Sequence, residues 1–341
     1  MNCILRCSSL FLFFCCQLFF TSCVKLDNVD GYDTLSKGAK AAYERYNSIV
    51  KRETFSETFL FFTDPHLLKT DNVFSDEEKN TIIEAFSVAK ELFDTLKLNF
   101  CLCGGDWLNY SNTQAIAKEK LLFADRQMKL LFSRYYKMLG NHDTNYQGIV
   151  SVDNNARGDL PRDFIDKEYF NETGSAYYSF WGSNTLFYVL DSGLDWTPAM
   201  DKYRWEQVKW LSAQLLKTQS EHMVLCLHMF RIKDITPMSK LLVDLIDAFN
   251  SRRTITLGGE DYGEDYDYSM VKGKIHFVIS GHNHEDGLIY VGENTNIPVI
   301  QTCNYTIDGK STFDICAVNY EKSVLKLIRV GFGEDREVQI L

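Results

Sequence analysis

Leu-Gly-Asn-His-Asp, at residues 139–143, directly follows Arg-Tyr-Tyr-Lys-Met at residues 134–138. The earlier run has the aromatic and apolar content of a β-strand, and Gly140 permits a sharp turn at its end. The turn would present an amide oxygen, an imidazole and a carboxylate at the edge of a sheet, and such groups bind metals or transfer protons. Because an ordinary polar turn has the same composition, the meaning of this stretch depends on the residues at the ends of the other strands.

Four other apolar runs are also followed by side chains that bind metals. They are residues 58–63 followed by Asp64 and His66, 98–103 by Asp106, 223–227 by His228, and 275–279 by His282 and His284. Taken alone, each group also fits a turn or a hydrogen-bonded rim residue. Of the 7 histidines, His222 and His276 lie outside the set, and we interpret both as structural. Loops at one end of a sheet converge in space, so we expect one shared site.

The remaining pattern alternates between strands and helices. Ser75 and Glu78 have the spacing of a capping box, which predicts the start of a helix. Further helices are expected over 38–50, 113–132, 203–217 and 238–249, a hairpin over 176–181 and 185–190, and strands over 289–291, 297–303, 313–319 and 325–330. Residues 144–174 and 260–268 are expected to be loops. This order predicts an α/β domain with mixed sheets.

The composition is that of a globular chain without a nucleic-acid-binding face. The chain has 341 residues, of which 45% are hydrophobic, and a net charge of −10 at pH 7. Contact with nucleic-acid phosphates requires clustered Lys and Arg, so this charge argues against such a partner. Cys101, Cys103, Cys226, Cys303 and Cys316 lie in the body of the chain and are expected to be buried thiols. Cys303 with Cys316 is the one pair that we consider as a disulfide.

The first residues resemble a bacterial lipoprotein signal. Arg6 precedes the apolar run Leu10–Phe20, which is too short to span a bilayer comfortably, and two small residues precede Cys23. Phe20 departs from the leucine that is usual there. We therefore expect a signal peptide at 1–22, a lipid anchor on Cys23, a tether at 23–57, and location on the periplasmic or cell-surface side of a bacterial membrane. A plain secretory signal or an uncleaved anchor is the alternative.

The order of the polar groups resembles the calcineurin-like metallophosphoesterase family. The shared series is Asp-x-His, Gly-Asp, Gly-Asn-His-Asp, a lone His after a strand, and Gly-His-x-His, and it extends over residues 58–284. The resemblance implies a four-layer αββα sandwich of two mixed sheets over residues 58–341, with a two-metal centre at the strand ends. It places one ion on Asp64, His66, Asp106 and His284, and the other on Asp106, Asn141, His228 and His282. Asp106 would bridge the two ions.

The resemblance also implies a reaction, the hydrolysis of a phosphomonoester or phosphodiester. Two divalent ions of manganese, iron or zinc would lower the pKa of a bridging water, and the resulting hydroxide would attack the phosphorus. His142 would act as the general acid that protonates the leaving group, and Asp143 would orient His142. Asn109 stands where purple acid phosphatases have a tyrosine, and the Asp-Arg-Gly sequence of protein Ser/Thr phosphatases is missing after Asp106. Both branches are therefore disfavoured.

Two other functions are compatible with the same residues. One is a non-catalytic binding lipoprotein on a metallophosphoesterase scaffold, and the other is a metal-dependent hydrolase of another bond, such as an amide. No expected ligand is missing, which favours the phosphoesterase. Trp107, Tyr146, Trp196, Phe230 and the loop from Tyr262 to Tyr268 could line a substrate pocket, although core or rim packing is the simpler interpretation of each.

Overall fold

The computed structural model describes most of the chain beyond its N-terminal segment. The described residues are 32–50, 52–68, 73–109, 113–145, 159–192, 201–230, 237–259, 262–307 and 310–341. The expected signal peptide at 1–22 and the lipid site at Cys23 lie outside them, as do Tyr146 and Trp196. Within the described ranges, no helix is long and apolar enough to cross a bilayer.

Two six-stranded sheets form the centre of the structure. In spatial order, the first sheet consists of β16 (Arg336–Gln339), β15 (Val324–Val330), β14 (Phe313–Asn319), β1 (Glu57–Phe62), β2 (Phe100–Cys103) and β3 (Tyr135–Lys137). The second consists of β10 (Gly287–Val291), β11 (Ile297–Gln301), β9 (Lys274–Ser280), β6 (His222–Leu227), β5 (Leu186–Leu190) and β4 (Tyr178–Trp181). Both sheets are mixed: β1, β2 and β3 are parallel to one another, as are β5, β6, β9 and β11, while the remaining pairings in the two sheets are antiparallel.

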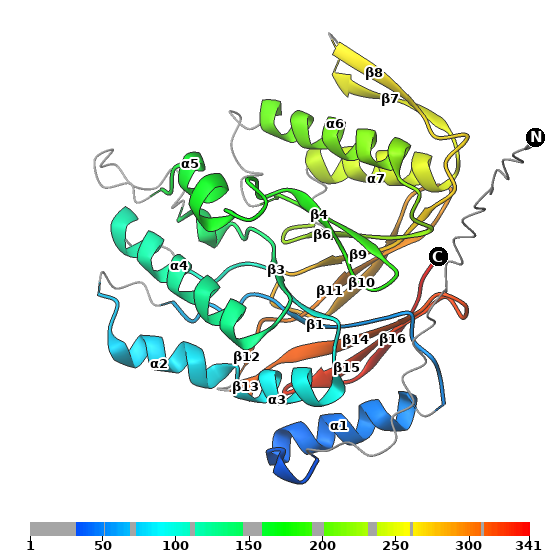
Figure 1. Cartoon of the computed structure of the whole chain (residues 1–341). Helices are drawn as coiled ribbons and strands as arrows, with labels where there is room; N and C mark the ends of the chain where they lie inside the picture. The colour runs from blue at the N-terminus through cyan, green and yellow to red at the C-terminus, as the bar shows by residue number, and fades with distance from the viewer. Residues whose placement is uncertain are drawn as a thin grey trace, which may run out of the picture.

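Helices cover the outer faces of the two sheets (Figure 1). On the side of the first sheet lie α1 (Lys37–Val50), α2 (Asp76–Ala85), α3 (Ser87–Leu96) and α4 (Gln114–Leu131). On the side of the second lie α6 (Asp201–Lys217) and α7 (Pro237–Asn250). The expected αββα sandwich of two mixed sheets is therefore confirmed.

Aromatic side chains fill the space between the sheets. Phe59 of β1 stacks on Phe100 of β2 at 4.9 Å between ring centroids. Phe187 of β5 packs edge-on against both rings, at 5.6 Å from Phe59 and 5.0 Å from Phe100. Burying each such side chain contributes about 1.5–3 kcal/mol to the free energy of unfolding. This packing explains why β1 is apolar on both faces: one faces the second sheet and the other faces helices.

Three local predictions need correction. Part of the expected loop at 144–174 is helical, in α5 (Arg162–Phe164) and a π-helix at Ile165–Tyr169. Residues 262–267 of the expected loop at 260–268 form β8 (Tyr262–Asp267), which pairs with β7 (Thr254–Gly259) in a hairpin. Tyr266 lies between Asp265 and Asp267, and it packs with Leu257 in the same core cluster as α6 and α7. Strand β16 and the short pair β12 (Thr306–Ile307) and β13 (Lys310–Ser311) were not expected.

Other predictions agree with the structure. The Ser75 hydroxyl caps α2 by accepting the backbone N–H of Glu78 at 3.2 Å. The five cysteines of the described chain are buried free thiols, so Cys303 and Cys316 form no disulfide in this structure. Trp107 is fully buried against Phe62, and Phe230 is 2% exposed, so both pack in the core rather than line an open pocket.

Candidate metal centre

The loops that follow β1, β2, β3, β6 and β9 meet at one edge of the sandwich. The parallel direction of β1, β2 and β3 brings their carboxyl ends together, and the same holds for β6 and β9 in the second sheet. The first sheet supplies Asp64, His66, Asp106, Asn141, His142 and Asp143, and the second supplies His228, His282 and His284. The five strand ends therefore converge as the sequence predicted.

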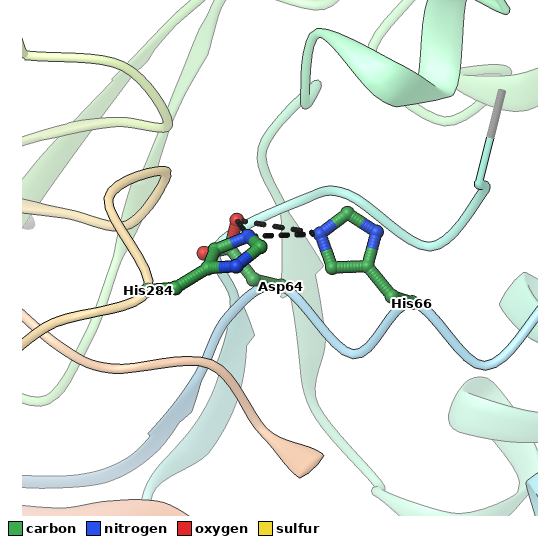
Figure 2. A group of neighbouring side chains, drawn as sticks. All are labelled: Asp64, His66 and His284. Atoms are coloured by element: carbon green, nitrogen blue, oxygen red, sulfur yellow. Dashed lines mark hydrogen bonds and ion pairs between the residues drawn. The ribbon is translucent and has the colours of Figure 1, made fainter. Parts of the chain in front are cut away.

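Asp64, His66 and His284 form the first group of side chains that can hold a metal ion (Figure 2). One ligand atom of each lies within 4.8 Å of the others. Nε2 of His284 lies 3.3 Å from Oδ1 of Asp64 and 3.0 Å from Nε2 of His66. Three donor atoms from both sheets thus point toward a common position.

Asp106, His228 and His282 form a second group, with one ligand atom of each again within 4.8 Å. Nε2 of His228 lies 3.1 Å from Oδ2 of Asp106. The Asn141 side-chain oxygen lies 3.1 Å from that same nitrogen and 2.9 Å from Nδ1 of His282. Oδ2 of Asp106 is also 3.9 Å from Nε2 of His66, so Asp106 lies between the two groups.

The donor atoms fit a pair of divalent cations. Oδ1 of Asp64 and Oδ2 of Asp106 are buried, and no standard hydrogen bond from the described residues satisfies either oxygen. Backbone carbonyls lie 3.1 Å from Nδ1 of His66 and 2.6 Å from Nδ1 of His228. These bonds place the proton on Nδ1, so Nε2 turns a lone pair toward the carboxylates. Lone pairs and carboxylates repel each other unless a cation lies between them, and this nitrogen and oxygen set suits manganese, iron(II) or zinc.

The two carboxylates favour the charged form of the His228 imidazole. Burial alone would lower the pKa of this imidazole, but the carboxylates of Asp106 and Asp64 raise it to about 10. Burial would likewise raise the pKa of Asp64, and the His228 charge with several hydrogen bonds lowers it instead. The site therefore attracts positive charge strongly.

The backbone is strained at most of the expected ligands. Asp64, His66, Asp106, His282 and His284 have φ of 50°, 45°, 63°, 75° and 57°. Non-glycine residues with positive φ cost about 1–3 kcal/mol each and cluster at functional sites. Two glycines permit the crowding: a Cβ on Gly281 would lie 1.9 Å from Oγ1 of Thr63, and one on Gly140 would lie 2.0 Å from Oδ1 of Asp106.

His142 lies at the rim of the site. Its side chain is 22% exposed, and its Nε2 is 3.9 Å from Oδ2 of Asp106. Its backbone N–H donates to Oδ1 of Asp106 at 2.8 Å. Burial lowers the pKa of the imidazole to about 4 in the absence of bound cations and substrate.

Asp143 makes contacts different from those that we expected. Its carboxylate is fully buried and accepts four backbone N–H groups, from Asp106 at 2.9 Å, Trp107 at 2.7 Å, Leu108 at 3.2 Å and Gly140 at 3.1 Å. None of these bonds goes to His142. The carboxylate thus joins the loop that carries Asp106 to the loop that carries Asn141. Burial and the Asp106 charge raise the pKa of Asp143 to about 6.

Sequence reasoning missed Thr63, which comes directly before Asp64. Its hydroxyl donates to Oδ2 of Asp64 at 2.6 Å, and the same oxygen accepts the backbone N–H of His282 at 2.9 Å. These bonds leave Oδ1 of Asp64 directed at the two histidines of its group. A threonine at the end of a strand has no distinctive pattern, so only the fold identifies it.

The calcineurin-like phosphoesterase family matches residues 57–286, and the chain belongs to this family. Among solved structures, a dimetal phosphatase from Danio rerio is similar, with a TM-score of 0.53, 12% identity, and coverage of 84% of this chain and 100% of that one. At this identity the likeness shows the fold alone. Vacuolar protein sorting 29 from Cryptosporidium parvum aligns with a TM-score of 0.33 and 12% identity over 84% of this chain and 97% of that one, which is too weak to carry an argument. No curated protein sequence matches significantly.

Proposed function

We propose that this protein hydrolyses a phosphomonoester or phosphodiester with two divalent metal ions, of manganese, iron or zinc. Asp64, His66, Asp106 and His284 would hold one ion, and Asp106, Asn141, His228 and His282 the other. The strongest support is the position of Asp106 between two groups of donors, together with the unsatisfied buried oxygens of both aspartates. Divalent cations bound there supply activation of water and neutralisation of the phosphate charge.

The chain itself positions these ligands before any substrate arrives. Thr63 and the backbone of His282 fix one oxygen of Asp64, and the His142 N–H fixes one oxygen of Asp106. In each aspartate the other oxygen remains directed into the site. Such preorganised groups act without rearrangement during the reaction.

We further propose that His142 is the general acid. It is the part-exposed imidazole beside the ligands that belongs to no expected ligand set, so a leaving group at the rim can reach it. The negative charge of a bound phosphoester would raise the pKa of His142 above its value in the empty site. The imidazole would then carry the proton that a departing alkoxide requires.

A substrate panel tests the proposed activity. Phosphomonoesters, cyclic nucleotides and bis-p-nitrophenyl phosphate would be assayed with added manganese, before and after chelation. We expect hydrolysis that depends on the metal and disappears in a His228→Ala variant. A metal-loaded wild-type protein that binds these esters without hydrolysing any of them would favour the binding lipoprotein instead.

We also propose that the protein is exported and tethered to a membrane by lipid on Cys23, on the periplasmic or cell-surface side. The support is the pattern of the first 23 residues in the sequence. Mass spectrometry of the mature N-terminus should find a lipid-modified cysteine, and processing should be sensitive to globomycin. An unmodified mature N-terminus at another residue would contradict the anchor.

A further inference from the structure

A partly buried cluster of charged side chains lies beside the loop of His284, outside the motifs that define the metal centre. The cluster consists of Asp286, Asp314, Arg329 and Arg336. Three members belong to the first sheet, on β14, β15 and β16, whereas Asp286 follows β9 of the second sheet. The two positive and two negative charges balance, and the cluster ties one sheet to the other.

Arg329 is the centre of this cluster and is 1% exposed. Its Nε donates to Oδ1 of Asp314 at 2.8 Å, and its Nη2 donates to Oδ1 of Asp286 at 2.7 Å and to Oδ2 of Asp314 at 3.2 Å. Its Nη1 donates to the Phe332 carbonyl at 2.9 Å and contacts Sγ of Cys303 at 2.8 Å. A planar guanidinium with all its nitrogens engaged fixes the positions of both carboxylates.

Asp286 lies close to the metal centre along the chain. Besides Arg329, its Oδ1 accepts the backbone N–H of Cys303 at 3.1 Å and lies 3.3 Å from Nη1 of Arg336. Only one residue separates Asp286 from His284 along the chain. The contacts of Asp286 with Arg329, Arg336 and Cys303 therefore hold the backbone immediately beyond that histidine.

His284 and His282 differ in the contacts that hold them. The His284 side chain is 46% exposed, and its contacts at the site are with Asp64 and His66, the other members of its own group. His282, in contrast, is held through its backbone N–H by Asp64 and through its ring by Asn141. His282 is thus held by contacts within the site, whereas the contacts that hold the chain just beyond His284 lie outside it.

We propose that Asp286 and Arg329 are positioning residues for His284, which set the affinity of the metal-binding group formed by Asp64, His66 and His284. This inference rests on the proposed two-metal centre. The metal affinity of the second group, formed by Asp106, Asn141, His228 and His282, should not depend on the ion-pair cluster.

The test is a calorimetric titration of metal-free protein with Mn²⁺, which measures each affinity. Elemental analysis then counts the bound ions. Wild type should bind two ions. In Asp286→Asn, one of the two affinities should fall about tenfold or more, as it does when groups that support metal ligands are removed. The other affinity should stay at the wild-type value. Arg336→Met removes a partly exposed partner of Asp286 and should lower the affinity for the same ion by a smaller factor. This variant is the alternative if Asp286→Asn does not fold.

Asp247→Asn is the matched control. Asp247 makes the same kinds of contact as Asp286, since it accepts Nη2 of Arg253 at 3.0 Å and the backbone N–H of Asn294 at 3.1 Å. Its side chain is more buried, at 6% exposed against 30% for Asp286. It braces the turn between β10 and β11, whereas Asp286 directly precedes the other end of β10. We expect this variant to lose thermal stability and to bind both ions as wild type does.

Two results would overturn the positioning role. In one, folded Asp286→Asn or Arg336→Met binds both ions with wild-type affinity. In the other, Asp247→Asn loses one ion to the same degree as Asp286→Asn, which would indicate a general effect of stability. If wild type itself binds no ions, the proposed function is wrong, and that failure is distinct from either of these.

Discussion

Strands β6 and β9 each carry a histidine near both ends, and the two ends differ in what surrounds the imidazoles. At the carboxyl ends, His228 and His282 face Asp106 and Asn141. At the other ends, Nδ1 of His222 lies 2.9 Å from Nε2 of His276, and the His222 ring stacks on Tyr320 at 3.8 Å between centroids. The same residue type on the same strands therefore meets carboxylates at one end and aromatic packing at the other.

The difference shows in the pKa values. Burial acts on both histidines, but Asp106 and Asp64 raise the pKa of His228 to about 10, whereas burial lowers that of His276 to about 3 despite a hydrogen bond to the Leu341 carbonyl. The first environment is built to hold a positive charge and the second to exclude one. A histidine in this fold thus indicates a metal site only where the opposite sheet supplies carboxylates, which agrees with our structural interpretation of His222 and His276.

Asp106→Asn should have the largest effect at the metal end. The neutral amide no longer attracts cations between the two ligand groups, so both ions should bind more weakly and hydrolysis should fall on the order of 10²–10³-fold. Elemental analysis and steady-state kinetics would measure both. His222→Gln at the other end is the control and should leave metal content unchanged. Wild-type occupancy in Asp106→Asn would contradict the position of Asp106 between the two ions.

His142→Ala should reduce activity in a way that depends on the leaving group. With alkyl phosphates the loss should be on the order of 10²–10⁴-fold, the usual contribution of a general acid. With p-nitrophenyl esters it should be much smaller, because p-nitrophenolate leaves without a proton. Equal losses on both substrates would remove the general-acid role.

Asp143→Asn separates the expected role of that residue from the contacts that the structure shows. The amide keeps one acceptor and turns an N–H₂ toward backbone donors, so the free energy of unfolding should fall by about 1–3 kcal/mol. If the carboxylate acts through the Asp106 loop, the activity loss should be the same for good and poor leaving groups. A loss that varies with the leaving group, as for His142→Ala, would instead restore the role of orienting His142.

His276→Gln should have the smallest effect on activity, and its distinctive effect should appear in the pH dependence of stability. Because folding lowers the pKa of His276, the neutral ring stabilises the protein above pH 6.5, and this stability is lost as the pH falls toward about 3. Between pH 6.5 and 4, metal-free wild type should lose on the order of 1–3 kcal/mol more than the variant. Urea unfolding at several pH values would measure the difference, and parallel curves would show that His276 does not titrate this way.

The sequence predicted those parts of the fold and site that have local patterns. Buried strands are continuous apolar runs, and parallel strands place their ends together, so Asp64, His228 and His282 could be assigned to one site. The partners of Asp143 could not be predicted, because they are backbone N–H groups, which almost every residue has. The pairing of Arg329 with Asp286 could not be predicted either, since the two residues are 43 positions apart and their contact joins the two sheets. Strand β8 was missed because its acidic residues, Glu264, Asp265 and Asp267, obscured the alternation of its tyrosines.

The most direct test of the two-metal centre is anomalous diffraction from crystals of the wild-type protein soaked in Mn²⁺. We expect two peaks at the strand ends, one among Asp64, His66 and His284 and one among Asn141, His228 and His282, with Asp106 in contact with both. A single peak, or no peak at these residues in fully soaked crystals, would contradict the two-metal centre.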